Sequence, residues 1–434
     1  MVKPDMEQWK DMRFGMFIHW GLYALMGRGE WAMYNEAIDV DVYRRLMDKF
    51  TAEKFDARAW AKAAKSAGMK YMVLTTRHHD GFSLWDSKCS VGNFTSMQSA
   101  AHRDFVREYV DACRAEGLKV GLYYSPLDWR LPGFFFPRMY ASSANELRRQ
   151  CHEQIRELLT NYGKIDIMWI DGGEDAWLCH GRNLHVSGDG KGEAQCPGFW
   201  HADELDKMMR ELQPGIVINN RYGDRSLGNY LTPEGHAGSF NVDEPWESCM
   251  TINAAWGWTP TPPRSLREII SLLVRNATGD GNFLFNVGPR ADGSIEPEQL
   301  ERLHEVGQWL DKYGESIYST RGGPFRNTDW GGMTRRDNVI YVHVWDWKQV
   351  RVTLPEMRAG IVSVKSLTAQ DLHVDLSGGR LSISVGESDR MMPDTIIKIE
   401  LDRNASEIAD KDTLWCSSYA SDLKNGALIV EDLT

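Results

Sequence analysis

The sequence lacks an excess of positive charge. It contains 61 Asp and Glu residues against 50 Lys and Arg residues, which gives a formal net charge of −11 at pH 7. Nucleic acids and anionic membrane surfaces attract proteins mainly through basic residues. We therefore expect no nucleic-acid partner and no membrane association, and a ligand that is neutral or recognised by local contacts.

The cysteine and histidine spacings of common metal sites and disulfide frameworks are also missing. No CxxC, HxH or HExxH motif occurs, and the seven cysteines are odd in number and scattered, at Cys89, Cys113, Cys151, Cys179, Cys196, Cys249 and Cys416. This pattern excludes a disulfide-stapled fold and a zinc knuckle. Most of these cysteines are expected to be buried thiols.

Long hydrophobic runs are absent too. No window approaches the length that crosses a bilayer, and the first residues, MVKPDMEQWKDMRFG, have no apolar signal-peptide core. We expect a soluble protein with no signal peptide in the chain as given. A secreted or periplasmic protein whose leader has been removed stays an open alternative.

What the sequence does contain is a long alternation of helical and strand-like segments. Helical periodicity occurs at residues 55–67, 104–116, 147–162, 205–212, 265–279 and 298–313, and strand-like runs occur at 16–21, 69–76, 118–125, 164–171, 216–221 and 281–290. Such alternation indicates parallel strands with helical crossovers. Its length of roughly 300 residues and the absence of GxGxxG and P-loop motifs favour a (β/α)8-like TIM barrel over an open sheet.

The pattern changes near residue 323. Short runs with period-two alternation follow, among them NVIYVHVWDW, LHVDLS and TIIKIEL, which are typical of an antiparallel β-sandwich. The sequence therefore predicts a barrel over residues 1–322, a sandwich over 323–402 and an unassigned tail over 403–434.

Polar residues recur where the predicted barrel strands end. KIDIMWIDGG finishes on Asp171, and His19, His78, His79 and Arg221 occupy comparable positions on other strands. Barrel enzymes assemble their active sites at the carboxyl ends of the strands. These side chains are therefore candidates for one site.

A second carboxylate would allow glycoside hydrolysis. Glu234 and Glu247 both lie next to loops that we expect to border the barrel mouth. A nucleophile and an acid/base about 5 to 5.5 Å apart hydrolyse glycosides with retention of configuration. The 17 Trp, 15 Tyr and 15 Phe residues could supply apolar surfaces for a sugar.

The histidines allow a second interpretation. His19, His78, His79 and Asp171 could bind a metal, but adjacent residues of a strand point to opposite faces, which argues against His78 and His79 acting together. We favour a polar clamp for hydroxyl groups.

Nine segments, taken together, resemble those of the glycoside hydrolase family 29 α-L-fucosidases. They are RFGMFIHWG, GEWAMYNE, TTRHHDGFSLWDS, GLKVGLYYSPLDW, IMWIDGG, NNRYGD, LTPEG, PWESCMTINAAWGW and GNFLFNVGPRADG. The resemblance runs from about Trp9 to Tyr318 and implies a retaining exo-acting enzyme on terminal α-L-fucosyl linkages, with no cofactor and no metal. Its partner would be a fucosylated oligosaccharide or glycoconjugate, and a homo-oligomer is an open expectation.

The resemblance also implies residue roles. Asp171 corresponds to the nucleophile, Glu234 of the TPE segment to the acid/base, and Glu247 of the WE segment is the reserve acid/base. We expect the substrate-binding residues to be His19, Glu30, Trp31, His78, His79, Tyr123, Trp169, Arg221 and Trp256.

Two departures from the family pattern concern the leaving-group side. The last aromatic motif is WGW rather than WGY, and the insertion at residues 174–200 is long and polar.

Two other interpretations of the function stay open: a fucose-binding barrel without catalytic activity, and a metal-dependent hydrolase that uses the strand-end histidines.

Overall fold

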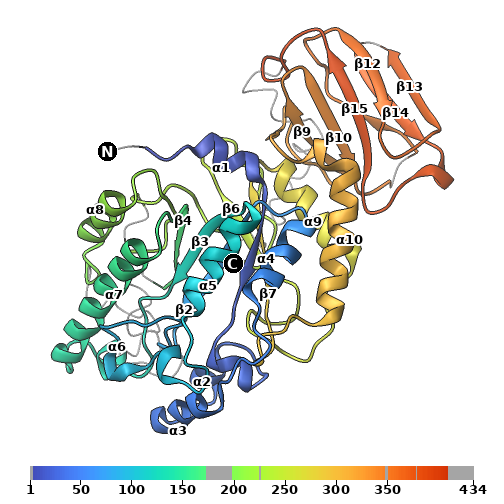
Figure 1. Ribbon diagram of the computed structural model, residues 1–434. Helices are drawn as coiled ribbons and strands as arrows, with labels where there is room; N and C mark the ends of the chain where they lie inside the picture. Colours follow the sequence, from blue (N-terminus) through green and yellow to red (C-terminus); the bar gives the residue numbers. More distant parts are fainter. Residues whose placement is uncertain (1–2, 173–197, 224–225, 348–349, 378, 409–434) are drawn as a thin grey trace, which may run out of the picture.

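The computed structural model describes residues 3–172, 198–223, 226–347, 350–377 and 379–408. The chain forms a parallel barrel wrapped by helices and a smaller antiparallel part at one end of it (Figure 1). The predicted insertion at 174–200 lies outside the described residues except for 198–200, and the predicted tail at 403–434 lies outside them except for 403–408. The expected domain limits at 322 and 402 stay predictions.

Seven parallel strands make up most of the barrel. Along the sheet their order is β5-β4-β3-β2-β1-β7-β6. Their bounds are β1 Phe14–Ile18, β2 Tyr71–Arg77, β3 Lys119–Tyr124, β4 Ile167–Ile170, β5 Val217–Ile218, β6 Glu247–Thr251 and β7 Asn282–Val287. Because the strands are parallel, all of their carboxyl ends meet on one rim.

The segment at residues 230–234 closes the ring between β5 and β6. Parallel bridges join Asn219 to Tyr230 on one side, and Leu231 to Trp246 and Glu234 to Cys249 on the other. This eighth element follows β5 without a described crossover helix, so it departs from the alternation seen in the sequence. The (β/α)8-like barrel is otherwise as predicted.

Helices cover the outside of the barrel. The longer ones are α1 Met6–Met12, α4 Ala57–Ser66, α5 Phe105–Glu116, α7 Ala141–Asn161, α8 Ala202–Leu212, α9 Leu266–Thr278 and α10 Pro297–Tyr313, and the short ones are α2 Ala32–Asn35, α3 Val40–Arg44 and α6 Pro132–Phe135. Ser265 caps α9 through a capping box with Glu268.

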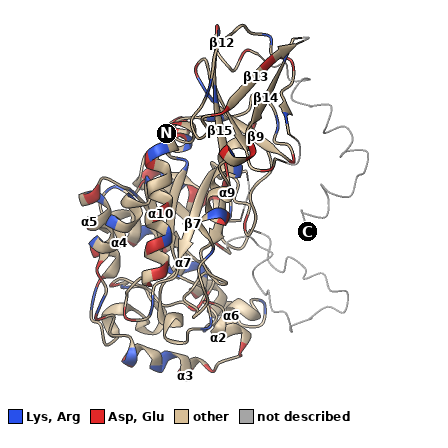
Figure 2. Cartoon of the chain, turned by 90° about the vertical axis from the view of Figure 1, so that its right-hand side faces the viewer, with Lys and Arg blue, Asp and Glu red and all other residues tan. Residues whose placement is uncertain are grey.

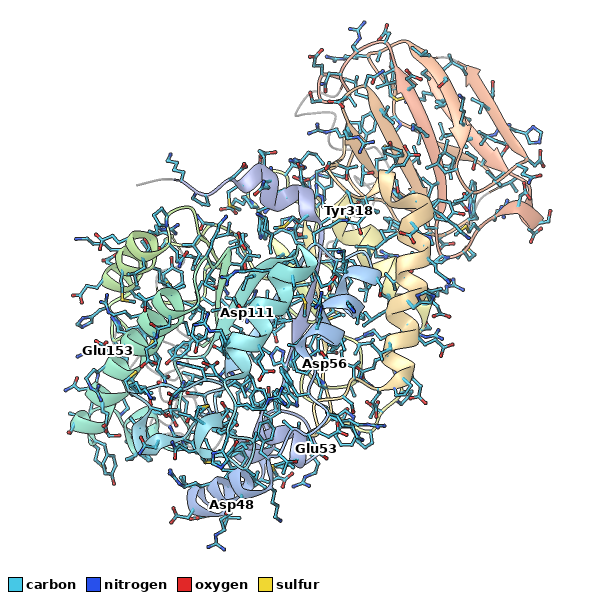
Figure 3. The ribbon with its side chains drawn as sticks, viewed as in Figure 1. Asp48, Glu53, Asp56, Asp111, Glu153 and Tyr318 are labelled. Atoms are coloured by element: carbon cyan, nitrogen blue, oxygen red, sulfur yellow. The ribbon has the colours of Figure 1, made fainter. Side chains whose placement is uncertain are left out.

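Lys, Arg, Asp and Glu residues recur along these helices (Figure 2). Asp111 on α5 and Glu153 on α7, for example, are exposed and project away from the barrel (Figure 3). The opposite helix faces pack on the strands, in a core that includes Trp60, Val106 and Leu303. Among the described helices, none combines the length and apolar composition that crossing a membrane requires.

The barrel interior has its own cluster of buried side chains. Trp9 of α1 packs on Tyr230 with ring centroids 4.5 Å apart, at the end where the strands begin. Above them lie Phe17, Tyr71, Val73, Tyr123, Ile167, Trp169, Val217, Cys249 and Leu284. The barrel interior is therefore filled at the end where the strands begin, and the pocket described below opens at the opposite rim.

Two antiparallel sheets form the C-terminal part, as predicted. Their orders are β12-β15-β10-β9-β8 and β11-β14-β13. The bounds are β8 Arg321–Gly322, β9 Gly331–Arg336, β10 Val339–Val344, β11 Val352–Thr353, β12 Ile361–Ser366, β13 Leu372–Ser377, β14 Arg380–Val385 and β15 Thr395–Leu401. The short helices α2 and α6 lie at the far end of the barrel from these sheets (Figure 1).

Candidate active site

The predicted site residues come from seven different positions on the strand-end rim. One pocket is lined by nine of them, His19, Trp31, His78, His79, Tyr123, Trp169, Asp171, Glu234 and Trp256. Glu30 lines a second, outer pocket that shares Trp31, Glu234 and Trp256 with the first. The rim therefore brings together side chains that are more than 230 residues apart in the sequence.

Asp171 directly follows β4, and its two carboxylate oxygens contact three neighbouring side chains. Its Oδ2 accepts a hydrogen bond from the Tyr123 hydroxyl at 2.9 Å and lies 3.6 Å from His79 Nε2, while its Oδ1 lies 3.1 Å from Arg221 Nη1. Burial raises the pKa of this carboxyl, but the Arg221 and His79 charges and the hydrogen bonds outweigh it, so the pKa lies below its ordinary value. Asp171 is thus an anion at neutral pH.

Arg221 connects the two candidate catalytic carboxylates. The same Nη1 atom donates to Asp171 Oδ1 at 3.1 Å and to Glu234 Oε2 at 2.7 Å. The distance between these two oxygens therefore cannot exceed the sum of the two hydrogen-bond lengths. That upper limit is close to the separation of about 5 to 5.5 Å between the two carboxyl groups of retaining glycosidases. Thr232 holds the guanidinium through its hydroxyl and its carbonyl oxygen.

The two carboxylates differ in exposure. The Asp171 side chain is 15% exposed, whereas that of Glu234 is 41% exposed. Glu234 also lines both the inner and the outer pocket. It therefore stands where the inner pocket opens to solvent, while Asp171 lies deeper.

Three histidines form the polar wall of the inner pocket. Burial lowers the pKa of His19 to about 3 and that of His79 to about 4, and it also lowers the pKa of His78 well below its usual range. All three rings are therefore neutral near pH 7, and each has one donor and one acceptor nitrogen. The buried Nδ1 of His78 has no partner within the described residues, so it is available to a bound hydroxyl group.

The sequence interpretation of the histidine pair was wrong. We had expected His78 and His79 to point to opposite faces, but β2 ends at Arg77, and both rings lie beyond it with centroids 4.1 Å apart. Strand alternation does not apply after the strand ends. Both histidines line the pocket.

Polar residues missed by the sequence analysis hold the site in place. Asn219 donates to and accepts from the backbone of Ile170, the residue before Asp171. Asn286 pairs with His19 Nδ1 at 2.7 Å and donates to the carbonyl oxygen of Trp256. Asn219 lies in the NNR segment and Asn286 in FLFN, so their strand-end positions were the available clue.

Aromatic rings complete the walls. The Trp256 ring lies 5.1 Å from His19, and Trp169 lies under Arg221, whose guanidinium is 5.0 Å from the ring. Phe17 and Cys249 also line the pocket and were missed, because within continuous apolar strands nothing distinguishes an inward residue from its neighbours. Polar and apolar surfaces thus face the same small space.

Glu247 does not lie at the barrel mouth, contrary to expectation. It is the first residue of β6, is 1% exposed, and lines neither pocket. Glu247 points to other polar groups inside the barrel. Its Oε2 accepts from Tyr71 at 2.5 Å and its Oε1 from Trp169 at 3.1 Å.

The donor set for a metal is only partly present. Within the described ranges, His78, His79 and Asp171 bring ligand atoms within 4.8 Å of one another, and His19 is not part of that group. The same carboxylate lies 3.1 Å from the Arg221 guanidinium, whose positive charge would repel a divalent cation. These residues fit a hydroxyl-rich ligand better than a metal ion.

Comparisons with known proteins agree with this geometry. The family model described as alpha-L-fucosidase matches residues 1–315. The rat tissue alpha-L-fucosidase is 30% identical over 395 residues, which cover 82% of this chain and 80% of that protein.

Solved structures are similar over nearly the whole chain. Alpha-L-fucosidase isoenzyme 1 from Paenibacillus thiaminolyticus is 35% identical with a TM-score of 0.78, covering 92% of this chain and 99% of that one. A GH29 alpha-L-fucosidase from Bacteroides thetaiotaomicron, captured as a covalent intermediate with 2-fluoro-fucosyl fluoride, is 28% identical with a TM-score of 0.79, covering 92% and 97%. The chain therefore belongs to the α-L-fucosidase family of glycoside hydrolases.

Proposed function

We propose that the protein is a retaining exo-α-L-fucosidase in which Asp171 is the nucleophile and Glu234 the acid/base. The observation that carries this proposal is the pair of contacts from one Arg221 nitrogen to both carboxylates at the rim of one pocket. The reaction class, hydrolysis of α-L-fucosides, follows from the family.

In the first step Asp171 attacks the anomeric carbon of fucose. Its lowered pKa keeps it ionised, and Tyr123 and His79 hold the oxygen that faces them. Glu234 gives its proton to the leaving oxygen, and a covalent fucosyl-enzyme forms with inverted configuration.

In the second step Glu234 acts as a base. It takes a proton from a water molecule that attacks the anomeric carbon from the side that the leaving group has vacated. The second inversion restores the original anomeric configuration. The exposure of Glu234, at 41%, leaves it accessible to the water molecule whose proton it takes.

The inner pocket has the chemistry of a fucose site. Neutral histidines and Tyr123 can bind hydroxyl groups, whereas Phe17, Trp169 and Trp256 offer apolar surface to the C5 methyl group of a deoxy sugar. The filled barrel interior below leaves no passage for a longer chain, which supports action on terminal residues.

The outer pocket lies on the leaving-group side. It shares Glu234 with the inner pocket and is also lined by Arg28, Asn35, Thr251 and Arg264. These polar side chains suit the hydroxyl groups of a second sugar. We therefore propose a fucosylated oligosaccharide or glycoconjugate as substrate.

Replacing each carboxylate tests the assignment. Asp171→Gly and Glu234→Gly should each lose at least about a thousandfold in kcat on an aryl fucoside. Azide should restore turnover of an aryl α-fucoside in both variants. The Asp171 variant should form β-fucosyl azide by a single inversion, and the Glu234 variant should form α-fucosyl azide, because azide then attacks the inverted fucosyl-enzyme. Full activity of the Asp171 variant would refute the proposal.

A further inference from the structure

Glu247 is a buried acidic group that the two-step mechanism does not use. It lies in the barrel interior, below the pocket floor, and is 1% exposed. Both of its oxygens are occupied by donors, Trp169 Nε1 at 3.1 Å and the Tyr71 hydroxyl at 2.5 Å. Gly15 leaves the space for the Tyr71 ring, because a Cβ there would collide with it.

Trp169 links Glu247 to the side chains that surround Asp171. Its ring stacks on Tyr123, with centroids 5.7 Å apart and planes 19° apart, and lies 5.0 Å below the Arg221 guanidinium. Tyr123 and Arg221 are the two groups that hydrogen-bond to Asp171. One indole thus supports both partners of the nucleophile, and Glu247 holds that indole through its only N–H group.

We propose that Glu247 is a positioning residue, which fixes Trp169 and thereby orients Tyr123 and Arg221 around Asp171, and that it is not the proton donor. This inference rests on the proposed roles of Asp171 and Glu234. Glu247 lines neither pocket, so its oxygens do not reach the glycosidic bond.

The state of the carboxyl group is consistent with this role. Burial raises its pKa to about 7, although the hydrogen bonds from Tyr71 and Trp169 lower it. A carboxyl group accepts a hydrogen bond from the indole N–H in either protonation state, because a carbonyl oxygen is present in both. Its anchoring role therefore does not require a fixed charge.

The test compares variants that keep or remove the anchor. In Glu247→Gln the amide oxygen can still accept from Trp169, and the amide nitrogen can donate to Tyr71. We expect kcat/KM within about threefold of the original enzyme. In Glu247→Leu and in Trp169→Phe the anchoring bond is lost, and because small misplacements of reacting groups are costly, kcat/KM should fall about 10- to 100-fold.

Two further readouts separate positioning from general destabilisation. The acidic limb of the pH profile of kcat/KM should move to higher pH in Glu247→Leu and Trp169→Phe, because Tyr123 and Arg221 then lower the Asp171 pKa less effectively.

The variant that combines Glu247→Leu with Trp169→Phe should lose no more kcat/KM than the more impaired of the two single variants, as expected for two residues that act through one bond. Trp60→Phe is the matched control, since it removes another buried indole bond, to Gly293, away from the site.

A series of aryl fucosides with leaving groups of different acidity decides between the roles. A positioning residue lowers kcat/KM by the same factor for every leaving group. If Glu247→Gln instead loses about 100-fold or more with poor leaving groups only, and azide rescues it, Glu247 is the proton donor and the inference is wrong. Equal activity of Trp169→Phe and Trp60→Phe would also overturn it.

Should Glu247→Leu fail to fold, Trp169→Phe and Glu247→Gln still decide the matter, because both keep the buried volume nearly filled. Failure of the proposed function would look different. In that case Asp171→Gly would retain turnover, whatever the Glu247 variants did.

Discussion

A single nitrogen of Arg221 lies between Asp171 and Glu234, at 3.1 Å from one carboxylate and 2.7 Å from the other. The positive charge allows two acidic groups to stand at the same rim without repelling each other. It also lowers the pKa of Asp171, against the effect of burial. The arrangement therefore sets both the spacing and the ionisation of the proposed catalytic pair.

Substitution of Arg221 should affect both properties. Arg221→Lys keeps a charge but not the planar fork that also binds Thr232, and we expect a loss of about 10- to 100-fold in kcat/KM. Arg221→Ala should lose more and should shift the acidic limb to higher pH, since the main cause that lowers the Asp171 pKa is gone. An acidic limb that stays in place in Arg221→Ala would contradict this account.

Tyr123→Phe isolates one hydrogen bond to the nucleophile. The ring can still stack on Trp169, but the 2.9 Å bond from the hydroxyl to Asp171 Oδ2 is lost. We expect about a tenfold lower kcat and a higher pKa for the acidic limb, both measured with an aryl fucoside. Tyr109→Phe is the control, because its hydroxyl bonds to the Gly121 carbonyl oxygen away from the pocket.

The glycine after Asp171 is required by the backbone. Gly172 has a φ of +79°, and a Cβ atom there would lie 2.8 Å from Leu127. Gly172→Ala should therefore displace Asp171 and lower kcat at least about tenfold. Gly215→Ala provides the matched control, since its φ is +85° but nothing lies within 4 Å of the added atom. Equal kcat values for the two variants would argue against the steric explanation.

Asp128 anchors a buried ion-pair network behind the histidines. It pairs with Arg77 at 2.7 Å and with Arg130 at 2.6 Å, and both its own side chain and that of Arg77 are fully buried. Asp128→Asn leaves the Arg77 charge without its partner, and the free energy of unfolding in urea should fall by about 3 to 5 kcal/mol. A decrease below about 1 kcal/mol would contradict this.

The same network predicts a pH dependence of stability. Burial raises the pKa of Asp128, but the charges of Arg130 and Arg77 outweigh it, and the net pKa lies below its ordinary value. Its contribution is therefore present above the unfolded-state pKa of about 3.9 and is lost as the pH falls through the lower folded-state value. The free energy of unfolding, measured with urea, should therefore decrease less on acidification in Asp128→Asn than in the original protein.

Much of the fold could be predicted because the outer helices and barrel strands carry clear periodicities. The site could be located because His19 and Asp171 directly follow strands and Arg221 lies three residues after one, and parallel strands gather such residues on one rim. The polar segment around Glu247 was misread, since a barrel interior can hold acidic groups when tyrosine and tryptophan donate to them.

Other features depend on contacts that no local pattern encodes. The segment 230–234 acts as a strand only because β5 and β6 lie on either side of it. The sequence also does not show that two carboxylates share one Arg221 nitrogen, because the three residues lie on separate elements. Residues 173–197 and 409–434, for which the sequence analysis made no assignment of role, lie outside the described ranges.

The most direct test of the account is the identity of the residue that carries the covalent intermediate. Incubation with 2-fluoro-fucosyl fluoride, followed by peptide mapping by mass spectrometry, should place one fluorofucosyl group on the peptide containing Asp171. A label on Glu234, on Glu247 or on no residue, in an enzyme that is active on aryl fucosides, would contradict the assignment of Asp171 as the nucleophile.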